Sequence, residues 1–190
     1  MRIVAGRFRG RKLAELGKGD PAAHLRPTTD RVRESLFNIL AGGRFGDPFD
    51  GREVLDLFAG TGALGLEALS RGAEHVTFVD DGRVAQRLLR QNVDLLGVQE
   101  QTYLLSCDVR RLPSAERACG LIFLDPPYGT GIGGYALASA VSAGWVAPQA
   151  IIVWEDNGPQ AAPSGFVHLD SRRYGDTAVT VLRFDGGSGS

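Results

Sequence analysis

The stretch VLDLFAGTGALG, residues 54–65, decides the fold of this 190-residue chain. The apolar run Val54–Phe58 predicts a buried strand, and the leucines of Ala63–Ser70 predict a helix directly after it. Glycines between the two elements let the backbone approach a ligand closely, and the N-terminus of the helix offers N–H groups to the acceptors of that ligand. The stretch therefore predicts a ligand-binding loop at the carboxyl end of a strand.

The alternation of strand and helix continues along the chain. Further strands are expected at His75–Asp80, Gln101–Ser106, Leu121–Asp125 and Ala150–Glu155, and further helices at Arg83–Leu96 and Gly134–Ala143. Phe166–Arg173 and Thr177–Phe184 are two more strands, and the short turn between them makes the pair antiparallel. We therefore predict an α/β, Rossmann-like fold. Its mostly parallel seven-stranded sheet has helices on both faces and ends in a C-terminal antiparallel hairpin.

The N-terminal part of the chain is strongly basic. Residues 1–33 carry nine Lys and Arg residues against three acids, a net charge of +6, while the whole chain has a formal net charge of −1. A basic segment on an acidic body indicates a polyanionic partner such as nucleic acid. Ile3–Ala5 and Arg11–Leu16 flank a turn-prone segment and predict a small basic hairpin. Apolar residues from Val32 to Leu40 then predict a helix that ends at a glycine pair.

These features divide the chain into three segments: a basic extension at 1–24, the main α/β domain at 25–184 and a flexible tail at 185–190. The apolar runs are too short for a membrane-spanning helix. The two cysteines, Cys107 and Cys119, do not have the spacing of metal ligands. We therefore expect a cytoplasmic protein that is a monomer and has no membrane or metal partner.

Two cofactors fit the glycine loop. Residues Gly60 to Gly65 satisfy the G-x-G-x-x-G pattern of dinucleotide-binding folds, and Asp80 ends the next strand about 20 residues later. Asp56 favours S-adenosylmethionine instead, because a carboxylate there would attract its ammonium group and repel a pyrophosphate. A structural capping role is the alternative for Asp56. Asp108 follows the third strand, in a position to accept a hydrogen bond from an adenine amino group or to cap a helix.

The most specific short signal is Asp125-Pro126-Pro127-Tyr128, at the end of the fourth strand. The two prolines stiffen the loop and hold the Asp125 carboxylate and the Pro126 carbonyl as acceptors. The aromatic ring that follows offers a flat face to a base. An acceptor pair beside such a ring predicts a site that holds a flipped-out base by its exocyclic amino group. Because the ring supplies the stacking face, we expect Tyr128→Phe to keep most of the activity.

The combination of D-L-F-A-G-T-G and D-P-P-Y resembles the amino-methyltransferases that modify adenine, cytosine or guanine. Residues 2–13, 25–38 and 62–72 closely resemble the bacterial 16S rRNA (guanine-N2)-methyltransferase family, also called RsmD. The resemblance covers essentially the whole chain except the tail. It implies a class I methyltransferase fold and N2-methylation of one guanine in small-subunit ribosomal RNA. It also implies that the guanine lies in a hairpin loop near the P site and that assembled or partly assembled subunits are the substrate.

The motifs and the resemblance together give three sets of expected site residues. The catalytic set is Asp125, Pro126, Pro127 and Tyr128. The cofactor set is Asp56, Phe58, Ala59, Gly60, Thr61, Gly62, Asp80, Asp81 and Asp108. The RNA-binding set, whose cations would bind phosphates, is Arg7, Arg9, Arg11, Arg26, Arg31 and Arg33. Many family members carry an acid where this chain has Gly82, so the division of ribose and adenine contacts between Asp80 and Asp81 stays open.

Three alternatives stand beside the ribosomal RNA methyltransferase. They are a DNA or protein amino-methyltransferase with the same D-P-P-Y site, a nicotinamide oxidoreductase, and a non-catalytic RNA-binding or assembly factor. If the basic extension serves RNA alone, its deletion leaves cofactor binding nearly intact and sharply reduces RNA methylation.

Overall fold

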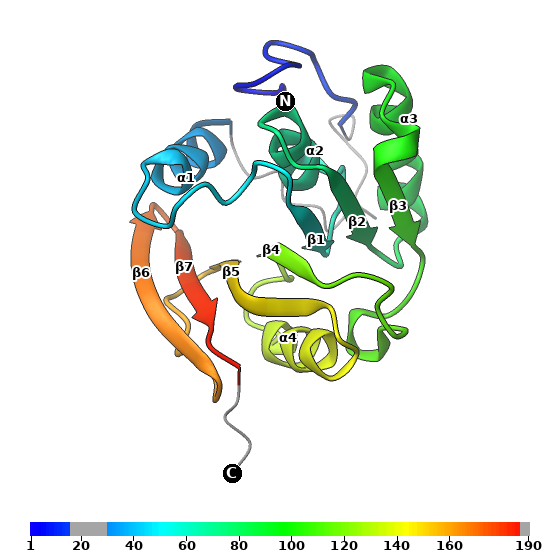
Figure 1. The fold of residues 1–190 in the computed structure, drawn as a ribbon. Helices are drawn as coiled ribbons and strands as arrows, with labels where there is room; N and C mark the ends of the chain where they lie inside the picture. Colours follow the sequence, from blue (N-terminus) through cyan, green and yellow to red (C-terminus); the bar gives the residue numbers. More distant parts are fainter. Residues whose placement is uncertain (16–29, 187–190) are drawn as a thin grey trace.

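A seven-stranded sheet forms the centre of the part of the chain that the structure describes, residues 1–15 and 30–186 of a computed structural model. The strand order is β3-β2-β1-β4-β5-β7-β6 (Figure 1). The strands are β1 Glu53–Leu57, β2 His75–Val79, β3 Thr102–Leu105, β4 Cys119–Leu124, β5 Val146–Asp156, β6 Phe166–Tyr174 and β7 Thr177–Phe184. The helices are α1 Asp30–Ala41, α2 Ala63–Ser70, α3 Arg83–Leu96 and α4 Ile132–Ser142, with short 3₁₀ helices η1 Gln99–Gln101 and η2 Val109–Arg111.

The directions of the strands bring several strand ends to one edge of the sheet. Strands β1 to β5 run parallel, and β7 pairs antiparallel with both β5 and β6. This confirms the predicted mostly parallel sheet with a C-terminal antiparallel hairpin. The carboxyl ends of β1 to β5 meet at one edge, which we call the carboxyl edge. Because β7 runs the opposite way, its first residue, Thr177, belongs to the same edge.

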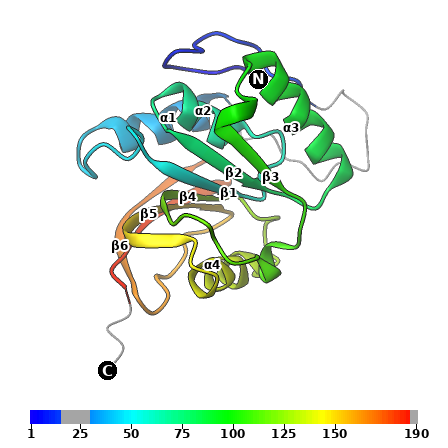
Figure 2. The ribbon, with the colours of Figure 1, turned by 45° about the vertical axis from the view of Figure 1, so that its right-hand side comes forward.

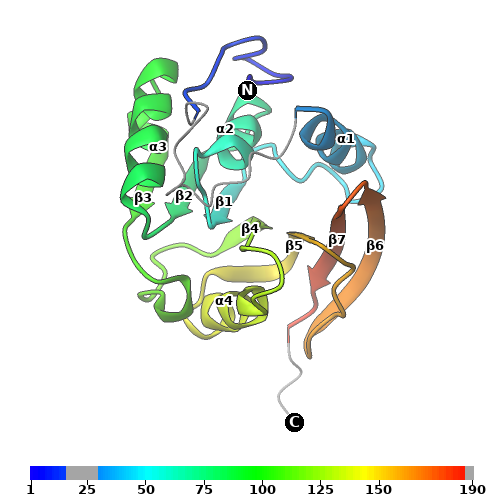
Figure 3. The same cartoon turned by 180° about the vertical axis from the view of Figure 1, so that it is seen from behind.

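Helices cover both faces of the sheet, as predicted. Helices α1, α2 and α3 lie on one face and α4 lies on the other (Figures 2 and 3). The alternation of side chains along a strand explains the two cores. On β4, Leu121 and Phe123 pack in the core under α1, α2 and α3, whereas Ile122 and Leu124 pack in the core with α4. Both sets are fully buried, which is why the parallel strands read as continuous apolar runs.

Three elements begin at least two residues earlier than the sequence pattern predicts, and the first of them, β4, starts at Cys119 rather than Leu121. Strand β5 starts at Val146 rather than Ala150, and its pairing with β4 contains a register shift between Cys119 and Leu121. Pro148 and Gln149 near the start of β5 interrupt the apolar pattern that the prediction relied on. Helix α4 starts at Ile132 rather than Gly134, because glycines inside its first turn look like a loop in sequence.

Residues 1–15, which we call the arm, cross the outer side of α2 (Figure 1). An isolated antiparallel bridge joins Arg2 and Lys12, and the Ile3 N–H donates to the Arg11 carbonyl at 2.9 Å. The pairing is a single bridge instead of two strands. Because Leu16 lies outside the described residues, the predicted hairpin and the boundary at residue 24 stay predictions.

Helix α2 packs very closely on β2, and Gly65 makes that packing possible. A Cβ atom on Gly65 would lie 2.5 Å from a ring carbon of Phe78 and 2.7 Å from Val76 Cγ1. Both neighbours are fully buried side chains of β2. The third glycine of the G-x-G-x-x-G pattern is therefore required by packing, whichever cofactor the loop binds.

We expect Gly65→Ala to lower the free energy of unfolding by about 1–3 kcal/mol, because the added methyl overpacks the α2–β2 contact. Urea unfolding followed by circular dichroism measures this. Gly134→Ala in α4 is the matched control, since its Cβ would meet Trp154 at an ordinary 3.9 Å. That control should be neutral or slightly stabilising because alanine favours helix. Equal stability of both variants would contradict the packing argument.

Candidate functional site

The glycine loop is held in an unusual backbone conformation at the carboxyl end of β1. Phe58, Gly60 and Gly62 all have positive φ angles, of 63°, 56° and 79°. The Ala59 N–H donates to the Val79 carbonyl at 3.1 Å, which ties the loop to the end of β2. A Cβ on Gly62 would lie 2.3 Å from Leu89 Cδ1 of α3. The loop is therefore shaped before any ligand arrives, as a close backbone approach to a ligand requires.

Asp80 joins the glycine loop to the loop after β2. Its carboxylate accepts hydrogen bonds from the Gly60 N–H at 2.9 Å and from the Gly82 N–H at 2.8 Å. Asp80 is half-buried, and burial raises the pKa of its carboxyl above the usual value, against the lowering effect of both N–H donors. Each carboxylate oxygen keeps a second lone pair for a ligand hydroxyl. The next residue, Asp81, is exposed.

Asp56 lies inside the protein, beneath the glycine loop. Its carboxylate accepts a hydrogen bond from the Gly65 N–H in the first turn of α2 at 2.9 Å. Only 1 % of the residue is exposed. Burial raises the pKa of the Asp56 carboxyl to about 8, the Gly65 N–H opposes this, and the negative charge of Asp80 adds to it. The capping alternative is thus present in the structure, and a contact with a cofactor stays a proposal.

The raised pKa of Asp56 predicts a pH dependence of stability. An unfolded Asp has a pKa of about 3.9. Between about pH 4 and about pH 8 the folded protein keeps a proton on Asp56 that the unfolded chain releases, so rising pH favours unfolding. Asp56→Asn cannot titrate, and it should flatten the slope by up to about 1.4 kcal/mol per pH unit.

Urea unfolding of the cofactor-free protein at several pH values in that window measures both slopes. Asp80, whose pKa is also raised, acts in the same direction and is present in both proteins. An identical slope in the parent and in Asp56→Asn would show that Asp56 is ionised in the folded state.

Asp108 caps η2, after the end of β3. Its carboxylate accepts from the Arg110 N–H at 2.9 Å and from the Arg110 guanidinium at 2.6 Å. These bonds and the positive charge of Arg110 lower the pKa of Asp108 to about 2. The helix that Asp108 caps is short, because η2 spans only Val109–Arg111. A contact with adenine stays a prediction.

The D-P-P-Y loop begins beside the glycine loop, on the neighbouring strand. Leu57 of β1 is paired with Leu124 of β4, and the Asp125 N–H donates to the Leu57 carbonyl at 3.4 Å. Asp125 is half-buried and Pro126 is buried, whereas Pro127 is exposed. The Thr130 hydroxyl donates to the Pro127 carbonyl at 2.7 Å and closes the loop. The cofactor and catalytic residues predicted from two separate motifs thus leave adjacent strands at the same level.

The hydroxyl of Tyr128 is held by two residues outside the motif. It donates to Glu155 Oε1 at 3.0 Å, and it lies 2.9 Å from the Thr177 hydroxyl. Glu155 stands near the end of β5 and is only 4 % exposed, and Thr177 is the first residue of β7. Burial raises the pKa of the Tyr128 phenol further above its usual value, so the phenol stays neutral. Sequence analysis missed both partners because they lie 27 and 49 residues beyond the motif.

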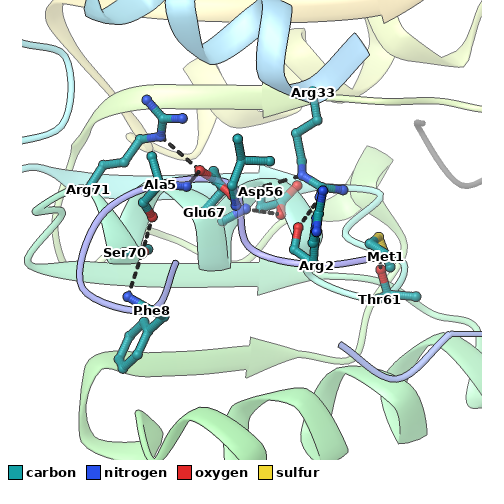
Figure 4. A network of polar contacts seen from close by, with 12 residues as sticks. Met1, Arg2, Ala5, Phe8, Arg33, Asp56, Thr61, Glu67, Ser70 and Arg71 are labelled. Atoms are coloured by element: carbon teal, nitrogen blue, oxygen red, sulfur yellow. Dashed lines mark hydrogen bonds and ion pairs between the residues drawn. The ribbon is translucent and has the colours of Figure 1, made fainter. Parts of the chain in front are cut away.

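The arm is docked on α2 through a buried carboxylate. Figure 4 shows Glu67 at the centre of this network. Glu67 is fully buried and accepts hydrogen bonds from the Val4 N–H at 2.8 Å, the Ala5 N–H at 3.0 Å and Arg71 Nε at 2.9 Å. Ser70, one turn later, donates to the Ala5 carbonyl at 2.5 Å and accepts from the Phe8 N–H at 3.0 Å. Charge-assisted bonds of this kind fix the arm as part of the folded body.

Arg33 takes part in the same docking and differs from the other arginines of the predicted RNA-binding set. Its side chain is fully buried, its guanidinium donates to the Arg2 carbonyl, and Nε lies 4.0 Å from Glu67 Oε2. Sequence charge alone did not show this burial. We therefore assign Arg33 to the docking of the arm and remove it from the proposed RNA contacts.

The other predicted RNA-binding arginines have different settings. Arg9 and Arg11 are exposed on the arm. Arg7 is also exposed, and its guanidinium donates to Gln101 Oε1 at 2.5 Å, beside the start of β3. Arg26 and the side chain of Arg31 lie outside the described part of the chain. Contact of these arginines with RNA stays a prediction.

The arm also reaches the glycine loop through Asn92 of α3. Asn92 is fully buried, and its amide group donates to the carbonyls of Ala14 at 3.1 Å and Thr61 at 2.9 Å. Its side-chain oxygen accepts from the Ala14 N–H at 2.6 Å. Deleting the arm would leave these buried groups without partners. We therefore expect deletion of the arm to disturb the cofactor loop, contrary to the expectation from sequence.

We expect Glu67→Gln to lower the free energy of unfolding by about 2–4 kcal/mol, because the amide NH₂ would face backbone N–H donors in a buried site. Urea unfolding measures the loss. Limited trypsin digestion should also cleave the arm of the variant faster at its exposed arginines. Glu15→Gln is the control, since Glu15 makes an exposed ion pair with the N-terminal amine at 3.1 Å and should matter little. Unchanged stability and cleavage would show that Glu67 does not hold the arm.

A cavity of about 360 Å³ lies at the opposite, amino edge of the parallel strands and includes Arg44, Arg52 and Arg183 in its lining. Asp170 pairs with Arg44 at 3.3 Å, and Asp185 pairs with Arg183 at 2.7 Å. These acids offset much of the positive charge. The cavity is also remote from the strand ends that carry the motifs, and we do not assign it to the site.

Within the described ranges, no cluster of His, Cys, Asp and Glu has the arrangement of a metal site. The same residues contain no helix long and apolar enough to cross a membrane.

The strand order and the two loops define a class of protein. A parallel sheet with an antiparallel β7 inserted between β5 and β6, and a glycine loop after β1, is the class I methyltransferase fold. The family model described as "Conserved hypothetical protein 95" matches residues 1–183, and the chain belongs to that family.

Named relatives agree with this assignment. The chain is 35% identical over 182 residues to "Ribosomal RNA small subunit methyltransferase D" of Haemophilus influenzae, covering 92% of this chain and 89% of that protein. It is 36% identical over 169 residues to the protein of the same name from Escherichia coli K12, covering 87% and 81%. The solved structure of yhhF from Escherichia coli superposes with a TM-score of 0.80 at 31% identity, over 97% and 98% of the two chains. The family expected from the sequence is confirmed.

Proposed function

We propose that this protein transfers a methyl group from S-adenosylmethionine to the exocyclic N2 of one guanine in 16S ribosomal RNA. The observation that carries the proposal is the hydrogen bond from the Asp125 N–H to the Leu57 carbonyl, at 3.4 Å. It places a loop suited to a base amine directly beside a loop suited to the cofactor. The names of the relatives support ribosomal RNA of the small subunit, and the resemblance of residues 2–13 and 25–38 supports guanine N2.

The residues at the carboxyl edge fit S-adenosylmethionine better than a dinucleotide. Carboxylates stand at the ends of three successive strands: Asp56, Asp80 and Asp108. Asp80 and Asp108 suit ribose hydroxyls and an adenine amino group, and their negative charges would repel a pyrophosphate. Asp56 is protonated in the cofactor-free protein below about pH 8, and the ammonium group of the cofactor would favour its ionised form. Residues 58–62 would lie along the cofactor, and exposed Asp81 is a further candidate for ribose or adenine. When bound, the cofactor supplies an already activated methyl group, so the protein needs mainly to align the acceptor.

The chain's own residues supply that alignment. The Asp125 carboxylate and the Pro126 carbonyl would accept hydrogen bonds from the guanine amino group and turn its lone pair toward the methyl donor. The Asp125 carboxylate would also take the proton that the amine loses. The Tyr128 ring would stack on the base, and burial keeps its phenol neutral by raising the pKa. Pro127 completes the rigid turn between them.

Positively charged residues outside the D-P-P-Y loop would bind the backbone of the RNA. The exposed arginines of the arm, Arg7, Arg9 and Arg11, would bind backbone phosphates, and Arg26 and Arg31 would add to them. RNA affinity should then fall steeply as salt rises. A ribosomal substrate would be met in the bacterial cytoplasm, and there the protein would act as a monomer.

We expect Asp125→Ala to lose at least about a hundredfold in turnover with unchanged cofactor affinity, because its carboxylate holds an amine that arrives only with RNA. The assay measures methyl transfer to purified small subunits, naked 16S rRNA and DNA, and mass spectrometry identifies the modified nucleoside. Asp94→Ala is the control, since Asp94 is an exposed acid of α3.

The same assay decides among the alternatives. N2-methylguanosine in ribosomal RNA supports the proposal, and a methylated DNA base would favour the DNA amino-methyltransferase. Calorimetry with S-adenosylmethionine and with NAD separates a methyltransferase from a nicotinamide oxidoreductase. Cofactor binding without transfer to any substrate would favour an assembly factor. Near-normal turnover of Asp125→Ala would overturn the amine-holding role.

A further inference from the structure

The D-P-P-Y loop depends on strands that the motif does not contain. The Tyr128 side chain extends from the loop after β4 to the neighbouring strands β5 and β7, where its hydroxyl meets Glu155 at 3.0 Å and Thr177 at 2.9 Å. The two partners approach the same phenol oxygen. A tyrosine fixed at its far end as well as at its backbone has a defined ring plane.

The sheet topology brings these partners together. In the antiparallel pairing of β5 with β7, Glu155 is opposite Val179 and Asp156 is opposite Ala178. Thr177 therefore stands just beyond the end of β5, at the carboxyl edge. A β7 strand parallel to β5 would place its last residue at this edge instead of its first. The inserted antiparallel strand is what delivers a hydroxyl to Tyr128.

Hydrogen-bond chemistry assigns the roles in this contact. A phenol has one proton to donate and an oxygen that can accept. Tyr128 donates to the Glu155 carboxylate, so the Thr177 hydroxyl is the donor to the phenol oxygen. Hydrogen bonds to a carboxylate are in general stronger than neutral ones, and Glu155 is almost entirely shielded from water, which would otherwise compete for the bond. The contact therefore resists rotation of the ring more than packing alone would.

We infer that Glu155 and Thr177 are positioning residues, which act through the Tyr128 hydroxyl to hold the ring in the plane that receives the target base. The inference rests on the proposed function, because it needs Tyr128 to stack on that base. It changes the expectation from sequence that Tyr128→Phe keeps most of the activity. A phenylalanine would keep the stacking face but lose both anchors of its plane.

A double-mutant cycle tests the inference, with kcat and KM measured for methylation of small subunits. Tyr128→Phe should lower kcat about tenfold, and Thr177→Val should lower it about threefold, with the KM for S-adenosylmethionine unchanged. The double variant Tyr128→Phe/Thr177→Val should be no slower than Tyr128→Phe, because Thr177 acts only through the lost hydroxyl. Thermal unfolding of each variant shows whether stability accounts for the loss.

Glu155 is tested by a conservative and a disruptive change. Glu155→Gln keeps an oxygen that can accept from the phenol and should stay within about threefold of the parent, whereas Glu155→Ala should lose about tenfold or more in kcat. Tyr103→Phe is the matched control, because Tyr103 is an exposed tyrosine of β3 whose loss should not change the rate.

The outcomes separate this inference from the proposed function. If the parent protein methylates no RNA, the proposed function fails and the inference fails with it. If the parent is active and the losses of Tyr128→Phe and Thr177→Val multiply, only the inference is overturned. The same holds if Tyr128→Phe has the parent rate. The inference is supported if the double variant has the same kcat as Tyr128→Phe and if Glu155→Gln keeps a kcat near that of the parent.

Discussion

The parallel pairing of β1 with β4 is the constraint on which the rest of the site depends. Leu57 and Leu124 form the last pair between the two strands, so Phe58 and Asp125 are the first residues after the paired strand ends. Two loops with different chemistry therefore start from one level and side by side. Residues from other strand ends help to hold these two loops in place. The neighbouring strand β2 contributes Asp80 to the first loop, and β5 contributes Glu155 to the second.

Two buried acidic side chains attach helix α2 to its surroundings. Asp56 beneath α2 binds the helix backbone at Gly65, and Glu67 on α2 binds the backbone of the arm. Both accept hydrogen bonds from main-chain N–H groups, which cannot move away as side chains can. Burial of an acid is tolerated when such donors face it. Helix α2 is thereby joined on one side to the sheet and on the other to the N-terminal residues, and the glycine loop lies between these two attachments.

The sequence predicted what local pattern controls. The strand and helix order, the antiparallel end of the sheet and the two loops followed from apolar runs and from glycine and proline positions. The starts of β4, β5 and α4 were missed because glycines, a proline and a glutamine interrupt the apolar pattern at these starts. Arg33 was misjudged because a count of charges says nothing of burial, and its neighbour Glu67 lies far away in sequence. Glu155 and Thr177 could not be predicted as partners of Tyr128, since their meeting depends on the order and direction of three strands.

The place of β7 within the sheet also has a consequence for folding. It is the last strand along the chain, yet it lies inside the sheet, between β5 and the edge strand β6. Contacts between residues far apart in sequence form late because closing long loops costs entropy. Tyr128 therefore precedes its anchor Thr177 by 49 residues, and the D-P-P-Y turn is synthesised before the strand that anchors it. A chain that does not yet extend through β7 contains the glycine loop and the D-P-P-Y turn but lacks the Thr177 hydroxyl, so the anchor of the Tyr128 ring is completed only with the closing strand.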